Sequence, residues 1–351
     1  MKFKPANIYL GIPSLHRCPI SPKDYAEFPP ITNLKSIIVQ YPAQPASLWQ
    51  RDLSANIISS SSRTLEDLEF DWMGGEKLLD FPALGGTVFP KLAKLKVTRY
   101  FDPDNGAVQR IGHAIVASFP NLEYLVINCD YLAIFSVAGQ LPNFPRSLNV
   151  LKVTGNFDTA KLACLSTIPA TLRTLFLGDG DTELEIDDRV DDVPTILYEL
   201  LNQQSATLEE LQVSIELLNE ERILEWTFPV FPALRKLCIP NCEIFSRILF
   251  ETGPGSGNFG PINYAIGFPV LQVLKINTHS GNSARVRSFI PPKVPRQVVE
   301  SVREADIRIF DHAITQDAHV VKQARIYARL LALFPNSRDS VIERLEVILQ
   351  I

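Results

Sequence analysis

The sequence predicts an α/β fold of stacked parallel strands, and a phrase that recurs along the chain is the main observation behind this prediction. A Phe-Pro pair leads into the pattern Leu-x-x-Leu-x-aliphatic. The clearest copies are FPKLAKLKV (89–97), FPNLEYLVI (119–127), FPALRKLCI (231–239) and FPVLQVLKI (268–276). Apolar and polar residues alternate within the pattern, as they do in a strand with one buried face. One such strand cannot bury its apolar face alone, so the copies are expected to stack into a solenoid.

The second observation is that the copies share one phase. Nine copies follow one another at intervals of 24 to 37 residues, and each interval can hold a helix and two turns. Their first leucines are Leu34, Leu65, Leu92, Leu122, Leu148, Leu172, Leu208, Leu234 and Leu271. A weaker copy, Ile342-x-x-Leu345-x-Val347, predicts a last strand near the end of the sequence.

Helices are expected between the strands. Residues 194–203 carry apolar residues at helical spacing, with Asp191 and Asp192 near the N-terminus of that stretch. Further helical stretches are expected at 108–118, 244–250 and 318–334, and a degenerate strand at 302–309. Pro ends a helix, so the Phe-Pro pair is expected to direct the chain into the next strand. The Phe ring is then expected to fill the space between helix and sheet.

The pattern resembles the leucine-rich repeat family over residues 30 to 280. The phrases LEYLVINC (122–129) and LRKLCIPNC (234–242) are similar to the cysteine-containing type, which includes ribonuclease-inhibitor-like proteins and F-box substrate receptors. The resemblance implies a horseshoe with a parallel concave sheet and convex helices. We expect an N-terminal edge or cap at 1–30, irregular repeats at 31–280, and a degenerate repeat with a helical and strand cap at 281–351.

Composition narrows the class of protein. The chain has 351 residues, 46% of them hydrophobic, and its formal net charge of −5 gives no argument for nucleic-acid binding. The sequence shows no secretory signal and no apolar run long enough to span a membrane. The five cysteines are scattered, which indicates reduced thiols and a cytoplasmic or nuclear location.

Two segments interrupt the rhythm of the repeats. Residues 179–192, DGDTELEIDDRVDD, hold eight carboxylates and one Arg. A solvated loop, an acidic contact for a basic partner and a calcium loop are the alternatives, although Leu184 and Val190 do not fit an EF-hand. Residues 253–261, GPGSGNFGP, contain G-x-G-x-x-G, but that motif needs a preceding strand and a following helix. We predict an insertion in a long repeat there.

No residues form a recognisable catalytic or metal-binding motif. The sequence lacks H-E-x-x-H, paired Cys-x-x-Cys, G-x-S-x-G and G-x-x-x-x-G-K-[ST]. His312 and His319, with Asp311 and Asp317, could suggest acid–base chemistry, but surface residues of a helical cap are the preferred interpretation. We therefore expect no enzymatic activity, no cofactor and no metal.

The predicted binding surface is the outward face of the strands, whose positions alternate with the buried aliphatic residues. An aromatic and aliphatic centre with a charged rim is typical of protein-binding surfaces. The predicted set is Lys94, Lys96, Tyr124, Val126, Val150, Lys152, Phe176, Lys236 and Lys275. Among these, Tyr124, Val126, Val150 and Phe176 would form the apolar centre. The alternative is that helices or a neighbouring loop cover this face.

These observations predict an intracellular protein that recognises another protein on its concave face, with no role in binding nucleic acid or membranes. The resemblance implies, as one function, the substrate-recognition part of an F-box-type ubiquitin ligase receptor, with a cullin–RING ligase adaptor as a second partner. No F-box motif of the type LP-x-E-[IL] is found at the N-terminus, so a relative without an F-box, a truncated product and a simple scaffold stay open. The alternative function is a ribonuclease-inhibitor-like regulator that wraps its partner.

Overall fold

The computed structural model describes residues 8–11, 31–41, 48–72, 87–97, 118–129, 132, 144–155, 159–169, 171–178, 183–184, 192–214, 216–217, 224–241, 245–278, 288–291, 297–309 and 316–349. The predicted helix at 108–118 and most of the acidic run at 179–192 lie outside these residues. The chain divides into two compact units. The first comprises Met1–Gly155 and Thr167–Pro169, and the second comprises Asn156–Ser166 and Ala170–Ile351.

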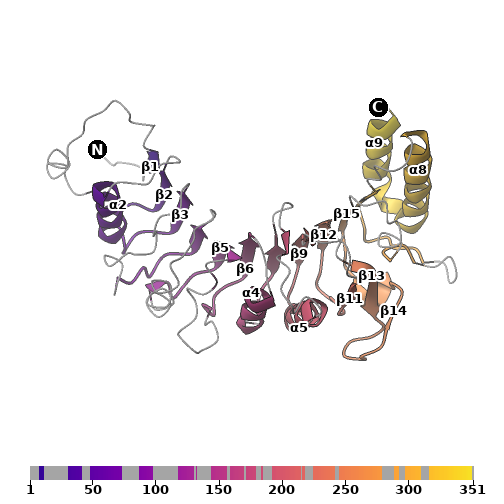
Figure 1. The fold of residues 1–351 in the computed structure, drawn as a ribbon, viewed down its shortest axis with the longest axis horizontal. Coiled ribbons are helices and arrows are strands. Elements are labelled where there is room, and N and C mark those ends of the chain that lie inside the picture. Colours follow the sequence, from indigo (N-terminus) through magenta and orange to yellow (C-terminus); the bar gives the residue numbers. More distant parts are fainter. Residues whose placement is uncertain are drawn as a thin grey trace. The chain divides into compact units, whose positions relative to one another are not determined.

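The first unit is built on parallel strands that follow one another in chain order (Figure 1). Its elements are β1 (Ile8–Gly11), β2 (Ser36–Tyr41), α2 (Leu48–Ser60), β3 (Asp67–Trp72), β4 (Lys94–Val97), β5 (Tyr124–Asn128) and β6 (Val150–Thr154). Each strand pairs in parallel with the next, and Leu68, Leu95, Leu125 and Leu151 stand in register. The second Leu of each motif copy therefore occupies the same place on successive strands.

The core of the first unit lies on one face of these strands. Leu95 and Val97 are buried, whereas Lys94 is exposed and Lys96 is half-buried, which is the alternation that the sequence predicts. The rings of Phe89 and Phe119, both from Phe-Pro pairs, are also buried, and their centroids lie 5.4 Å apart. These two Phe residues therefore belong to the core, while their predicted place between a helix and the sheet stays a prediction.

Successive motif copies are joined by the same hydrogen bonds in both units. Two consecutive N–H groups at the start of a strand donate to one carbonyl oxygen of the preceding copy, as Ala93 and Lys94 do to Glu66. A hydroxyl group one residue before the motif Leu donates to the carbonyl oxygen of the preceding motif Leu. Examples are Thr64 to Leu34 at 2.9 Å, Ser147 to Leu122 at 2.8 Å and Thr207 to Leu172 at 2.8 Å. The copies are thus equivalent in backbone geometry as well as in sequence.

The second unit has a parallel main sheet in the order β7-β9-β12-β15-β16. These strands are β7 (Thr174–Leu177), β9 (Glu210–Ser214), β12 (Lys236–Asn241), β15 (Val273–Thr278) and β16 (Glu304–Ile309). Short strands β8 (Glu183–Leu184) and β10 (Glu216–Leu217) form a parallel pair. The predicted degenerate strand at 302–309 is confirmed as β16, which pairs in register with β15.

A second layer of this unit combines helices with a small sheet (Figure 1). It contains α4 (Thr159–Cys164), α5 (Val193–Gln204), β11 (Leu224–Phe228), β13 (Phe245–Glu251), β14 (Phe259–Gly260) and α6 (Tyr264–Gly267). Helix α4 packs beside α5, and α5 beside β11, which pairs with β13. The helix predicted at 194–203 is therefore confirmed. The helix predicted at 244–250 is wrong, because Ile248 and Phe250 alternate with the less buried Arg247 and Leu249 and form β13.

The Gly-rich segment at 253–261 joins two antiparallel strands of this small sheet. Gly255 and Gly257 have φ angles of 64° and 63°, and Glu251 at the end of β13 pairs with Phe259. The oxygen Oε1 of Glu251, a buried residue, accepts a hydrogen bond from Gly257 N–H at 3.3 Å. A strand precedes the glycines and an antiparallel strand follows them, so the segment is a tight connection within the repeat interval.

Aromatic rings fill the space between the two layers of the second unit. Phe228 lies at the centre, with the ring centroids of Trp226, Phe250 and Phe268 at 4.1, 5.6 and 6.4 Å. The residues that share this fully or almost fully buried cluster are Trp226, Phe228, Phe231, Phe250, Phe268 and Phe289. Aromatic rings bury large apolar areas, so this cluster is a main source of stability for the second unit.

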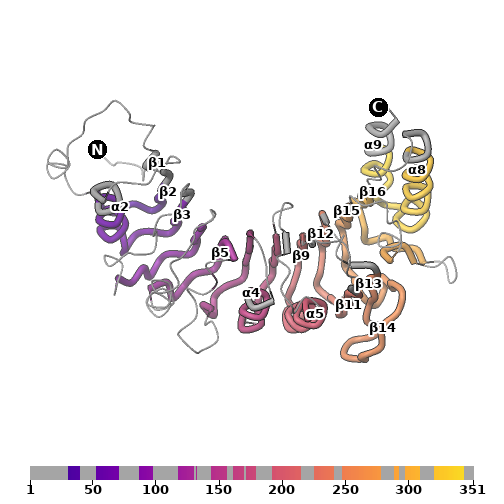
Figure 2. Tube along the Cα trace, viewed as in Figure 1, coloured from indigo at the N-terminus to yellow at the C-terminus, as the bar shows by residue number. Residues whose placement is uncertain are grey.

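The second unit ends in two helices that follow β16 (Figure 2). They are α8 (Gln316–Leu333) and α9 (Arg338–Leu349), joined by the short helix η5 (Pro335–Ser337). Gln323 of α8 donates to the carbonyl oxygen of Ile307 at 2.5 Å, and Ala305 N–H donates to Ser340 Oγ of α9 at 3.4 Å. The two helices therefore satisfy backbone groups of β16 that β15 does not reach. The predicted amphipathic helix at 318–334 is confirmed, but the strand predicted at 342–347 is wrong, because those residues belong to α9.

The predicted fold class is thus confirmed at the level of an α/β protein with parallel strands and helices. Its finer form, a leucine-rich repeat horseshoe with a concave sheet and convex helices, stays a prediction, as do the domain boundaries at residues 30 and 280.

Candidate functional site

The candidate site is the outward face of the strands, on the side opposite the core. In each unit it consists of two rows of side chains, because alternate residues of registered strands line up across a sheet. The first-unit face contains Asp67, Glu69, Lys94, Lys96, Tyr124, Val126, Val150 and Lys152. The second-unit face contains Thr174, Phe176, Glu210, Gln212, Lys236, Cys238, Val273, Lys275, Glu304 and Asp306.

Opposite charges face each other on β3 and β4 of the first unit. Asp67 stands opposite Lys94, and Glu69 opposite Lys96. Lys96 Nζ lies 2.5 Å from Glu69 Oε1. Lys94 is exposed, and among the described residues no carboxylate forms an ion pair with it. Burial raises the pKa of Asp67, an effect that the nearby Lys94 opposes in part.

The apolar part of the first-unit face lies on β5 and β6. Tyr124 stands opposite Val150, and Val126 opposite Lys152. The Nζ atom of Lys152 lies 5.8 Å from the centre of the Tyr124 ring, within the range of a cation–π contact. Tyr124 and Val150 are half-buried, so part of each is available to a partner. Val126, predicted as a contact residue, is only 6% exposed, so it can support this surface but offers a partner little area.

The second-unit face begins with an aromatic ring and a shared lysine. The Nζ atom of Lys236 lies 3.6 Å from Glu210 Oε2 and 6.0 Å from the centre of the Phe176 ring. Lys236 on β12 and Phe176 on β7 flank β9, so the lysine reaches across one strand. Phe176 belongs to the second unit, whereas the other predicted centre residues, Tyr124, Val126 and Val150, belong to the first.

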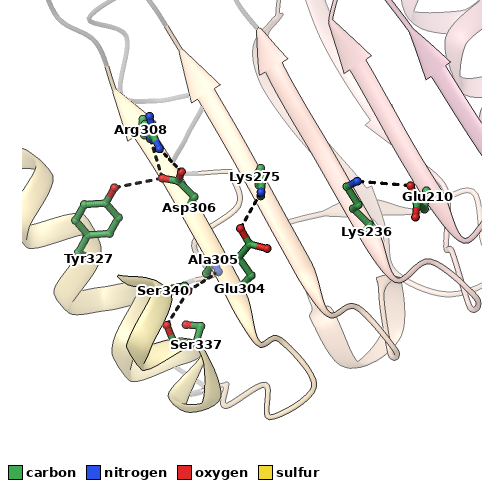
Figure 3. A network of polar contacts seen from close by, with 10 residues as sticks. All are labelled: Glu210, Lys236, Lys275, Glu304, Ala305, Asp306, Arg308, Tyr327, Ser337 and Ser340. Carbon is green, nitrogen blue, oxygen red and sulfur yellow. Dashed lines mark hydrogen bonds and ion pairs between the residues drawn. The ribbon is translucent and has the colours of Figure 1, made fainter. Parts of the chain in front are cut away.

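Further ion pairs complete the second-unit face near its last strand (Figure 3). Lys275 Nζ lies 2.7 Å from Glu304 Oε1 on the neighbouring strand. Arg308 donates two hydrogen bonds to Asp306, from Nε at 3.0 Å and from Nη2 at 2.6 Å. The hydroxyl group of Tyr327 on α8 donates to the same carboxylate at 3.2 Å. Asp306 is buried at this point, which explains why three donors converge on it.

Burial and polar contacts raise the pKa values of Arg308, Tyr327 and Cys238. The hydrogen bonds from Arg308 to Asp306 raise the pKa of the Arg308 guanidinium. Burial, followed by the nearby Asp306 charge, raises the pKa of Tyr327. Burial also raises the pKa of the Cys238 thiol, and the neighbouring Lys275 and Lys236 offset this only in part. The Cys238 thiol is therefore protonated at neutral pH and has little nucleophilic character.

Neither a metal-ligand cluster nor a membrane-spanning helix is found among the described residues. Among them, no three His, Cys, Asp or Glu side chains gather as metal ligands. Of the five histidines, none has a described side chain, so the suggested acid–base chemistry of His312 and His319 with Asp311 and Asp317 falls outside what the structure describes. In the same described part, no helix is both long enough and apolar enough to cross a bilayer.

The structure brings the predicted residues together in two groups. Lys94, Lys96, Tyr124, Val126, Val150 and Lys152 share the first-unit face, and Phe176, Lys236 and Lys275 share the second-unit face. The sequence-based set omitted Glu304, Asp306 and Arg308 on β16. The alternation of Ile307 and Ile309 with charged neighbours was the available signal for them.

Comparison of the chain with protein-family models, with curated proteins and with solved structures finds no match in any of the three.

Proposed function

We propose that this chain is a leucine-rich repeat solenoid that binds a protein partner through the outward face of its strands. The observation that carries the proposal is the repetition of one geometry. Each motif copy places its aliphatic residues in the core and its alternate residues on the outward face, in register with the next copy. Such stacking of equivalent units is the basis of solenoid repeat proteins, which use extended surfaces to bind other macromolecules.

The composition of the outward face supports a protein as the partner. Half-buried Tyr124 and Val150 supply apolar area, and the amine groups of Lys152 and Lys236 lie over aromatic rings. Aromatic side chains surrounded by charged groups are enriched at protein interfaces. The alternation of acidic and basic side chains on both faces suits a partner with its own mixed charges better than a nucleic acid, which requires an excess of positive charge.

Within this proposal, the substrate receptor of a cullin–RING ubiquitin ligase is one role, and a regulator that wraps its partner is the alternative. The similarity of the motif to F-box leucine-rich repeat proteins supports the first. The mixed charges along both faces are the observation that favours the second, because an inhibitor-like protein needs a long complementary surface. A scaffold with no link to a ligase uses the same surface.

Site-specific crosslinking in cells tests the proposed face. A photoreactive amino acid is placed in the full chain at Val150 or Gln212, which lie on the two faces. The controls carry it at Asn56 of α2 or Glu199 of α5, which are exposed residues away from the strands. We expect crosslinks to a protein partner from the face positions alone. Equal crosslinking from the helix positions would refute the proposed face. Recovery of a cullin adaptor together with the partner would select the ligase receptor over the regulator.

A further inference from the structure

The two faces differ in whether their lysine side chains form ion pairs with neighbouring carboxylates. On the second-unit face, Lys236 has Glu210 at 3.6 Å and Lys275 has Glu304 at 2.7 Å. On the first-unit face, Lys96 has Glu69, whereas Lys94 is exposed and stands opposite Asp67 without forming an ion pair with it or with any other described carboxylate. The first-unit face therefore holds a positive charge that a partner can use.

This difference determines on which face a new ion pair with a partner contributes most to the free energy of binding. A partner that covers Lys275 and Glu304 must remove water from a pair whose charges are already matched, so it pays the desolvation cost with little new attraction. A partner carboxylate that reaches Lys94 forms a new charge-assisted hydrogen bond. The aromatic ring beside it supplies the apolar area that such charged contacts need around them.

The apolar centre lies beside these lysines. Lys94 stands opposite Tyr124 on the neighbouring strand, and Tyr124 stands opposite Val150. Lys152 places its amine over the Tyr124 ring at 5.8 Å. Lys94 and Lys152 thus lie on the two sides of Tyr124, which is half-buried. The site combines an aromatic and aliphatic centre with ammonium groups on both sides.

We propose that strands β4 to β6 of the first unit are the primary contact site, and that they bind an acidic segment of the partner protein. That segment carries an Asp or Glu side chain beside at least one apolar side chain, with the carboxylate facing Lys94 and the apolar group against Tyr124 and Val150. The proposal rests on the proposed function and deepens it, because it names one face and the charge of the partner.

The test uses the full chain with the photoreactive amino acid at Val150 and changes single lysines. Lys94→Glu is expected to reduce partner crosslinking about tenfold or more, because it turns an attraction into a repulsion. Lys94→Arg keeps the positive charge and should leave partner crosslinking unchanged. Lys91→Glu is the matched control: it makes the same charge change on an exposed lysine of the same unit, outside the face. Thermal unfolding of every variant shows that the fold is kept.

Two further readouts address the chemistry of the partner. The peptide crosslinked to position 150, identified by mass spectrometry, should contain more Asp and Glu than Lys and Arg. Added poly-glutamate should compete with the crosslink, and added poly-lysine should not. A basic crosslinked peptide, or a crosslink to a second copy of this chain, would overturn the inference.

The outcomes separate this inference from the proposed function. If crosslinking survives Lys94→Glu but is lost in Lys236→Glu and Lys275→Glu, the strands still bind a protein, but the contact lies on the second unit. Absence of crosslinks from every face position refutes both the proposed function and the inference.

Discussion

The side-chain amide of Asn128 lies directly against the α-carbon of Gly155. A Cβ atom on Gly155 would come within 2.6 Å of Asn128 Nδ2 and within 2.8 Å of its Cγ and Oδ1. Gly155 also has a φ angle of 87°, a backbone conformation that side chains other than glycine rarely adopt. Asn128 ends β5 and Gly155 follows β6. The chain therefore leaves the sheet at a glycine that lies beside a buried amide.

Gly155→Ala should therefore destabilise the protein more than a glycine change in an open turn. We expect a loss of about 3 kcal/mol in the free energy of unfolding, from the positive φ and from the overlap with Asn128. Gly255→Ala is the control, because Gly255 has a φ angle of 64° but no atom within 4 Å of the added Cβ. It should lose only about 1 kcal/mol. Urea unfolding followed by circular dichroism compares the two variants. Equal losses would show that the Asn128 side chain moves away from the added methyl group without lowering the free energy of unfolding.

The Leu-x-x-Leu-x-aliphatic pattern predicted most strands of both main sheets, because its alternation reports which face is buried. The same pattern gave a wrong strand prediction at Ile342 and Leu345, because a spacing of three residues also places side chains on one face of a helix. The strands of the small sheet were missed for a different reason. In β13, for example, Ile248 and Phe250 alternate with less buried neighbours, but residues 244–250 were interpreted as a helical stretch.

The candidate site was predictable as a face but not as a set of contacts. Alternation alone placed Lys236 and Lys275 on the outward face. Their pairing with Glu210 and Glu304 depends on which strands are neighbours, and that is a tertiary property. The contact between Tyr327 and Asp306 joins a helix to a strand about twenty residues earlier. No local pattern in the sequence reports such a contact.

The hydroxyl groups that join successive motif copies should contribute measurably to stability. Thr207→Val removes the donor to the Leu172 carbonyl oxygen while keeping the shape of the side chain. We expect a loss of about 1 kcal/mol in the free energy of unfolding. Thr64→Val, which removes the equivalent bond to Leu34, should cost a similar amount. Thr195→Val on the exposed face of α5 should change the stability by less than about 0.5 kcal/mol. Chemical denaturation of the three variants checks this order.

The ion pair of Arg308 with Asp306 should matter more than an exposed pair. Arg308→Gln removes two charged hydrogen bonds from a buried carboxylate, and we expect a loss of about 2 kcal/mol. Arg247→Gln is the matched control, because Arg247 and Glu225 lie 3.6 Å apart with both side chains more than half exposed. That change should have almost no effect on stability. Equal effects in thermal unfolding would mean that the burial of Asp306 adds nothing to its pairing.

The buried tyrosines predict a loss of stability at alkaline pH. Burial raises the pKa of Tyr264 well above its usual value, and its hydroxyl group donates to the Phe289 carbonyl oxygen at 2.7 Å. Below about pH 10 the hydroxyl keeps its proton in both the folded and the unfolded chain. Above that pH the unfolded chain ionises first, so the free energy of unfolding falls as the pH rises.

Tyr264→Phe should therefore lower the stability near neutral pH and also weaken its decline at alkaline pH. Near neutral pH the variant should be less stable by about 1 kcal/mol, because the Phe289 carbonyl loses its donor. Above about pH 10 its stability should fall less steeply than that of the wild type, since one tyrosine no longer titrates. Part of the slope should remain, because burial also raises the pKa of Tyr327 and Tyr198. Urea denaturation at a series of pH values measures both effects, and parallel pH profiles for the two proteins would contradict the prediction.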